Sequence, residues 1–284
     1  MAHYLDPKND LTFKRIFGGH PALLINFLNA VMPLESERQI VEVEYLPSEL
    51  APETPTKKYS LVDVRCRDNY RRQFIVEMQM FWHRDFYNRI VFNAGKAYVR
   101  QLDSGENYHL LQPVYTLALV NQNFDLKTDR FYHHYQIVNR ENTDEIIPGL
   151  EFVLVELTDK FRPETISDHK LMALWLRFLK ETGEQMRTLP PEMQENEYIR
   201  QAAAICERGT FTPEELDAYD KYWDIIRTER TLRERTRRDA LAEGEAIGLE
   251  KAVINGTKAG YSMEVIATIT GLTPEQIAAM LHEE

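Results

Sequence analysis

The strongest restriction on the fold comes from two apolar runs joined by a polar turn. Residues 59–66 and 73–80 alternate apolar and polar side chains around the turn at 68–72. Alternation with a period of two predicts β-strands, and the turn predicts that they pair as an antiparallel hairpin. Successive strand residues point to opposite faces, so the even-numbered residues form one apolar face that we expect to be core. These residues are Val62, Val64, Cys66, Phe74, Val76, Met78 and Met80.

The odd-numbered face of this hairpin carries carboxylates among apolar residues. If the hairpin is symmetric about Tyr70, Asp63 lies opposite Glu77, and Gln79 follows on the same face. Like charges facing each other across a strand pair are destabilising, by roughly 0.2–1 kcal/mol when exposed and more when buried. A divalent cation between the carboxylates would offset the repulsion, and Mg²⁺ commonly uses one or two carboxylates with waters and substrate phosphates.

An alternative is that the odd-numbered face of the hairpin is exposed to solvent. Antiparallel sheets often expose one face to solvent, where Asp, Glu and Gln are hydrated and bind no ligand. The position of Asp63 favours a site, because Asp is depleted in strands and here stands between Val62 and Val64.

The same residues carry a resemblance to a known family. Asp63, Glu77 and Gln79 on a hairpin resemble the variant signature of the PD-(D/E)XK nuclease superfamily. Further segments resemble the Rpn family of recombination-promoting nucleases and transposases, so that the likeness covers nearly the whole chain. These segments are residues 5–18, 75–79, 84–89, 101–105, 113–119 and 260–272.

The resemblance implies an α/β, restriction-endonuclease-like fold with a mixed central sheet flanked by helices. It also implies that Asp63, Glu77 and Gln79 are catalytic, with Asp63 and Glu77 as ligands of Mg²⁺ or Mn²⁺. Gln79 stands where the superfamily more often has lysine, and its neutral amide can only form hydrogen bonds. Lys14 or Lys96, from flanking helices, could supply the missing charge.

Asp10 has two interpretations. The resemblance matches it to an acidic position near the start of the first helix, which contributes an outer or second metal contact. An acid in the first turn of a helix is also favoured by the helix dipole or as a cap, without any ligand. The sequence leaves both interpretations open.

DNA is the partner that the resemblance implies, although the chain carries a formal net charge of −11. An acidic balance opposes non-specific binding to a duplex, so phosphate contacts need local clusters of cations. Arg71 and Arg72 at the hairpin tip, with Arg84 and Arg89 on the following helix, are the candidates. The arginine-rich run at 227–238 alternates with Glu, which favours a solvated helix over a DNA contact.

Length and composition set further limits. A chain of 284 residues can form one large or two modest domains. No apolar run is long enough to span a membrane, and the first residues lack a signal-peptide pattern, so no membrane partner is expected. Cys66 and Cys206 are too few for a disulfide framework or a four-ligand zinc site, which favours a cytoplasmic location.

Hydrophobic periodicity predicts alternating helices and strands in the first part of the chain. A helix is expected over 9–31 with a break at 18–21, then a Pro-rich connector at 47–55 before the hairpin. An amphipathic helix is expected over 83–103, with Val99 among its inward residues. The further strands expected are 114–120, 131–138 and 152–157. This order suits a central mixed sheet flanked by helices.

From about residue 165 the pattern is helical. We therefore expect a nuclease-like domain at 1–165 and a helical C-terminal region at 166–284. Its predicted helices are 168–180, 192–206 and 213–242. The end, about 260–284, predicts two short helices around Gly271, similar to a helix-turn-helix. The second of them has no Arg or Lys, so packing, or a homo-oligomer through the C-terminal helices, is favoured over DNA reading.

Two functions from different classes remain. The favoured hypothesis is a metal-dependent DNA endonuclease that hydrolyses phosphodiester bonds and is linked to recombination or mobile elements. The alternative is a catalytically inactive member acting as a nucleic-acid or protein-binding module, which Gln79 and the acidic balance keep open. A metal-dependent phosphohydrolase acting on small nucleotides is a third, weaker option.

Overall fold

A computed structural model describes residues 3–50 and 60–282 of the chain. Tyr59, expected to begin the hairpin, and residues 51–55 of the connector lie outside the described residues. The contacts divide the chain into two compact units, one ending at Trp223 and the other beginning at Asp224. The domain boundary expected near residue 165 falls inside the first unit.

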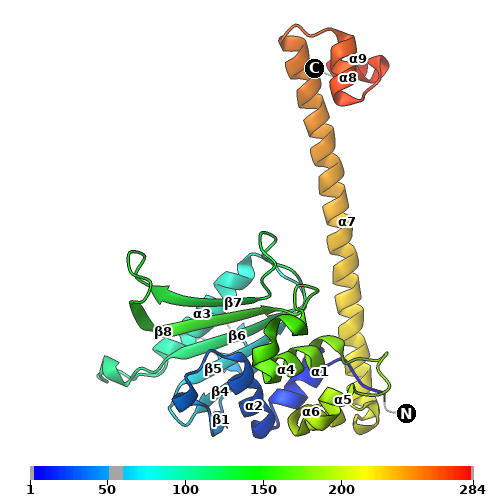
Figure 1. Cartoon of the computed structure of the whole chain (residues 1–284). Helices are drawn as coiled ribbons and strands as arrows, with labels where there is room; N and C mark the ends of the chain where they lie inside the picture. The colour runs from blue at the N-terminus through cyan, green and yellow to red at the C-terminus, as the bar shows by residue number, and fades with distance from the viewer. Residues whose placement is uncertain (1–2, 51–59, 283–284) are drawn as a thin grey trace. The chain divides into compact units, whose positions relative to one another are not determined.

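A six-stranded mixed sheet forms the centre of the first unit (Figure 1). Its strands are β1 (Val43–Tyr45), β4 (Val64–Asp68), β5 (Gln73–Gln79), β6 (Val114–Val120), β7 (Tyr132–Val138) and β8 (Ile146–Glu156). The strand order is β1-β4-β5-β6-β8-β7, with β5, β6 and β8 parallel and the others antiparallel to their neighbours. A separate two-stranded sheet consists of β2 (Glu49–Leu50) and β3 (Ser60–Leu61). The α/β fold with a mixed central sheet is confirmed.

Helices flank this sheet. In the first unit they are α1 (Asp10–Phe17), α2 (Pro21–Val31), α3 (Asp85–Val99), α4 (Lys170–Glu181), α5 (Pro191–Glu195) and α6 (Glu197–Ile205), with short 3-10 helices η1 (Ser36–Arg38), η2 (Tyr108–Leu110), η3 (Pro163–His169) and η4 (Arg208–Thr210). The break between α1 and α2 is confirmed, and Pro21 begins α2, where its missing N–H is least costly. Val99, expected to face inward, is instead 62% exposed at the end of α3.

The even-numbered face of the hairpin belongs to the main core, as predicted. Cys66, Phe74 and Val76 are buried there with residues of α1, α2, α4 and α6. Trp175 of α4 packs on Phe17 of α1, with their ring centroids 5.6 Å apart. Helices that follow residue 165 thus share one core with the N-terminal helices.

The odd-numbered face of the hairpin lies under α3 (Figure 1). Ile75 is fully buried and packs with Ala94 and Ala97 of this helix. The alternative of a wet sheet face therefore does not hold for Ile75 and Glu77, which are buried, whereas Leu61 on the same face is 53% exposed. Val62 also packs in this cluster, although alternation placed it on the opposite face. The chain bends at Asp63, between β3 and β4, and the bend interrupts the alternation.

The second unit has a small helical core. α7 (Pro213–Lys258), which is longer than predicted, begins in the first unit and ends in the second, followed by α8 (Met263–Thr270) and α9 (Pro274–His282). The core residues are Val253, Ile266 and Ile277, one from each helix. Gly271 ends α8 with a left-handed φ of 70°, which confirms the turn between two short helices. Homo-oligomer formation through these helices stays a prediction.

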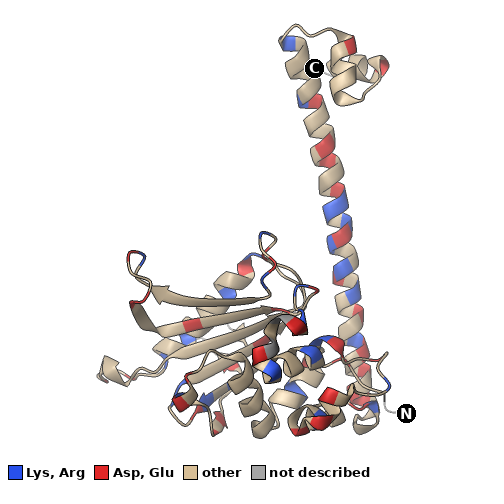
Figure 2. Cartoon of the chain, in the orientation of Figure 1, with Lys and Arg blue, Asp and Glu red and all other residues tan. Residues whose placement is uncertain are grey.

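The arginine-rich part of α7 is a solvated helix surface. Acidic and basic residues alternate along it (Figure 2). Arg227 pairs with Asp224 at 2.6 Å, and Arg233 pairs with Glu229 at 2.6 Å, which are intrahelical ion pairs. Among the helices of residues 3–50 and 60–282, none has an apolar stretch that would cross a bilayer.

Candidate active site

Asp63 lies just outside the paired part of the hairpin, close enough to Glu77 for the charge of Glu77 to raise its pKa. The register of β4 and β5 begins with Val64 opposite Val76, and Asp63 precedes this first pair. Asp63 sits at the bend before β4, and its Oδ2 atom accepts a hydrogen bond from the Met78 amide at 2.7 Å. Its side chain therefore reaches across to β5, beside Glu77.

Asp63 is a largely buried carboxylate in an acidic environment. Its side chain is 23% exposed. Burial raises the pKa of Asp63 to about 6; the Met78 amide lowers it, the charges of Glu77 and Asp10 raise it further, and Lys14 opposes them. Negative charge is therefore incompletely neutralised at this position.

The first helix contributes Asp10 and Lys14 to the same place. Lys14 Nζ lies 2.7 Å from Asp10 Oδ1 and 3.9 Å from Asp63 Oδ1. Asn9, rather than Asp10, is the N-cap of α1, and Asp10 lies in the first turn, where the helix dipole favours an acid. Asp10 thus combines a first-turn position with proximity to the site acid Asp63.

Glu77 receives its partners from α3. Its side chain is 5% exposed. Asn93 Nδ2 donates to Glu77 Oε1 at 3.0 Å, and Arg89 Nη2 donates to Glu77 Oε2 at 3.1 Å. Burial raises the pKa of Glu77, while Arg89 and Asn93 act in the opposite direction. The role of Asn93 was missed from the sequence; its signal is a polar residue on the inward face of an amphipathic helix.

Arg89 also joins Gln79 to the acids. Arg89 Nη2 donates to Gln79 Oε1 at 2.6 Å, and Gln79 Nε2 donates to the Phe81 carbonyl at 2.8 Å. The Arg89 side chain is 41% exposed, so its remaining donors are accessible to a substrate. A cation therefore stands beside the position where the superfamily more often carries lysine.

Other residues selected from the sequence lie elsewhere. Arg72 is buried and paired with Asp68, with 2.6 Å between Nη2 and Oδ2, so its prediction as a DNA contact is wrong. The hairpin turn directs this side chain into the core, a choice that local sequence does not reveal. Arg71 and Arg84 are exposed. Lys96 Nζ donates to a backbone carbonyl of β2 at 2.9 Å.

The acid pair, its hairpin and α3 all fall within one family match. Residues 7–230 match the model of the PD-(D/E)XK nuclease family transposases. The chain belongs to this family. The PD-(D/E)XK assignment confirms the resemblance seen in the sequence and supports a nuclease-like, transposase-linked role. No significant match was found among curated proteins or among solved structures.

PD-(D/E)XK nucleases typically use divalent metal ions. In residues 3–50 and 60–282, no three His, Cys, Asp or Glu side chains are grouped so as to hold one. The pair of Asp63 and Glu77 offers oxygen donors only, which suits Mg²⁺ or Mn²⁺, and Mg²⁺ often takes one or two carboxylates. Burial, and then the charges of Glu77 and Asp10, raise the pKa of Asp63, and a cation would favour its ionised form. The donors present fit such an ion.

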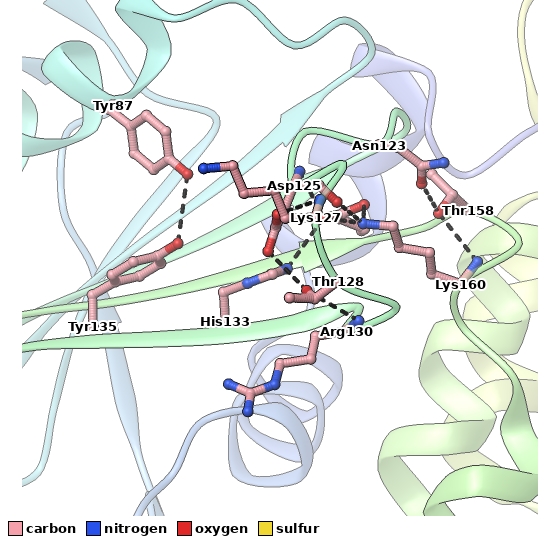
Figure 3. Close-up of polar contacts among 11 residues, drawn as sticks. Tyr87, Asn123, Asp125, Lys127, Thr128, Arg130, His133, Tyr135, Thr158 and Lys160 are labelled. Atoms are coloured by element: carbon pink, nitrogen blue, oxygen red, sulfur yellow. Dashed lines mark hydrogen bonds and ion pairs between the residues drawn. The ribbon is translucent and has the colours of Figure 1, made fainter.

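A second polar cluster lies at the end of β8. Glu156 is fully buried, with His133 Nε2 3.1 Å from its Oε1 and Lys160 Nζ 3.0 Å from its Oε2. Lys160 also donates to the Asp125 carbonyl, and Figure 3 shows their side chains converging. These contacts neutralise the buried Glu156 carboxylate and tie the loops after β6 and β8 to the sheet, which indicates a structural role.

Proposed function

We propose that the protein is a metal-dependent DNA endonuclease linked to recombination, in which Asp63 and Glu77 hold Mg²⁺ or Mn²⁺. The observation that supports this proposal is the closeness of two acids: Asp63 accepts a hydrogen bond from the amide of Met78, the residue after buried Glu77, and burial raises the pKa of Asp63 to about 6. Buried acids with perturbed pKa values cluster at functional sites because catalytic groups need pKa values matched to their task.

The surrounding residues orient this site. The Met78 amide fixes the Asp63 carboxylate, and Asn93 holds Oε1 of Glu77. When bound, the ion would polarise the scissile phosphodiester and lower the pKa of the attacking water. Asp10 would serve as an outer contact, with Lys14 balancing its charge.

Arg89 has the position and charge to act on the substrate. Its guanidinium lies 4.8 Å from the centroid of the Phe86 ring, and this stacking restricts its orientation. Fixed donors aimed at a reacting phosphate stabilise the negative charge that develops on its oxygens. Gln79, in the third catalytic position, would keep Arg89 in place through its 2.6 Å hydrogen bond.

A second candidate function is a catalytically inactive nucleic-acid or protein-binding module. One observation favours it: Arg89 and Asn93 already occupy both carboxylate oxygens of Glu77 with hydrogen bonds. A carboxylate satisfied in this way does not require a metal ion for stability.

A plasmid-nicking assay separates the two functions. Supercoiled plasmid is incubated with the full chain and Mg²⁺, Mn²⁺ or EDTA, and Asp63→Asn and Glu77→Gln are compared with Glu141→Gln, an exposed acid near the β7–β8 turn. We expect nicking that needs the metal, disappears in both site variants and persists in the control. Nicking that survives in both site variants would reject the site, whereas DNA binding without nicking would support the second function.

A further inference from the structure

A basic cavity opens at the opposite end of the catalytic hairpin. It measures about 450 Å³ and is lined by residues of β4, β5 and the segment after α3. Its cationic side chains are Arg65, Arg67, Arg71 and Arg100, and Glu106 is the acid among the lining residues that the structure describes. Arginine forks of this kind match the geometry of phosphate oxygens.

Arg65 is the most constrained of these cations. Its Nη2 donates to Gln73 Oε1 at 2.8 Å, and its Nη1 donates to the Pro47 carbonyl at 3.4 Å. Its Nε is buried and has no hydrogen-bond partner among the described residues. Burial lowers the pKa of Arg65, and the positive charges of Arg100 and Arg67 lower it further. The cavity therefore concentrates positive charge around the Arg65 side chain.

The hairpin turn presents Arg71 to the same cavity. Asp68 Oδ1 accepts hydrogen bonds from the amides of Tyr70 and Arg72, at 3.0 and 2.8 Å. These bonds fix the turn, in which Arg71 has a left-handed φ of 65°. A non-glycine residue held in this region is uncommon, and such outliers often mark functional positions. Arg67, in contrast, is engaged by Glu44 at 2.5 Å.

The cavity and the acid pair share one strand and one sheet face. Gln73 lines the cavity, and Glu77 lies on the same face further along β5. At about 3.3 Å per residue these positions are roughly 13 Å apart. That separation corresponds to about four steps of 3.4 Å measured along the axis of a DNA duplex.

We infer that Arg65, Arg71 and Arg100 form a subsite for a backbone phosphate of the nucleic-acid strand whose scissile bond lies at Asp63 and Glu77. The assignment of the scissile bond rests on the proposed endonuclease function. A phosphodiester would accept hydrogen bonds from the guanidinium groups that line the cavity and relieve the repulsion between neighbouring arginines. The subsite would position the strand without reading its sequence.

Salt-dependent DNA binding tests the subsite. Fluorescence anisotropy with a labelled duplex oligonucleotide, in EDTA to prevent cleavage, is measured over a range of KCl concentrations for the full chain. The variants are Arg71→Gln and Arg65→Gln, with Arg140→Gln, an exposed arginine after β7, as the matched control. For each subsite variant we expect the slope of log K against log[KCl] to become shallower by about 1, and no change for the control.

Competition and cleavage distinguish the remaining outcomes. An excess of unlabelled duplex should displace the probe; a nucleoside triphosphate that displaces it at lower concentration would identify a free nucleotide ligand and overturn the inference. Arg71 lies on an exposed turn. If the protein nicks plasmid but the slope of log K against log[KCl] is unchanged in Arg71→Gln, the subsite is overturned and the endonuclease proposal stands. Shallower slopes without nicking would support the subsite and reject the endonuclease.

Discussion

Nη2 of Arg89 on α3 lies 3.1 Å from Oε2 of Glu77 on β5, so the helix places a positive charge beside a buried carboxylate of the strand. The same nitrogen lies 2.6 Å from Oε1 of Gln79. We therefore expect Arg89→Gln to lower the nicking rate by about 100-fold, the order of effect seen when a fixed donor to a developing anion is removed. Initial rates at saturating Mg²⁺ measure this, with Arg140→Gln as control. An unchanged rate would remove Arg89 from the mechanism.

Gln79→Lys tests whether Arg89 stands in for a lysine. If it does, the double variant Gln79→Lys with Arg89→Gln should recover part of the rate that Arg89→Gln loses, because a cation returns to the same position. The measurement compares nicking rates and Mg²⁺ dependence of the single and double variants. Circular dichroism checks that the double variant is folded. If the folded double variant recovers none of the nicking rate, Arg89 does not stand in for a lysine at position 79.

Asp63→Asn should stabilise the protein in EDTA. Burial raises the pKa of Asp63 from 3.8 to about 6, so the folded state favours the protonated acid, and stability falls as pH rises from about 4 to about 6. At pH 7 the neutral variant, which keeps an acceptor for the Met78 amide, should therefore gain about 1–3 kcal/mol. Thermal unfolding at pH 7 measures the change. A lower midpoint for Asp63→Asn would show that the charge is well compensated without metal.

Arg72→Ala should destabilise the fold rather than weaken DNA binding specifically. Its pair with Asp68 is buried, and removal of one partner leaves an uncompensated charge, at a cost of about 3–5 kcal/mol. Arg71→Gly, at the adjacent residue with φ of 65°, should stay within about 1 kcal/mol of wild type. Urea unfolding curves give both values. Equal stabilities for Arg72→Ala and wild type would argue against a structural pair.

The thiols should be unreactive in the folded protein. Burial raises the pKa of Cys66 to about 12, and Cys206 is also buried with a raised pKa. The reactive thiolate is therefore scarce at pH 8. Ellman's reagent should modify neither cysteine in native buffer and both in guanidinium chloride, with Cys66→Ala and Cys206→Ala to assign the signals. Rapid native modification would mean that the core opens at these positions.

Some of the site could be predicted because it depends on local pairing. The turn that centres the hairpin on Tyr70 fixes which residues of the two strands face each other, so the position of the turn was enough to predict the observed register, with Val64 opposite Val76. Asp63 lies at a bend just before the paired residues, which alternation did not predict. The side chains around Asp63 and Glu77 come from other elements. Lys14 arrives from α1, and Arg89 and Asn93 arrive from α3.

The sequence by itself determined the mixed α/β class, the hairpin register, the break before Pro21 and the short helices around Gly271, because periodicity, turns and caps act between near neighbours. Only the tertiary structure decided that α3 packs on the acid-bearing face of the sheet and that the bend places Val62 in the cluster beneath this helix. It also decided that the Arg72 side chain is buried while Arg71 lines a cavity. These outcomes depend on packing between elements far apart in the chain, for which local pattern carries no information.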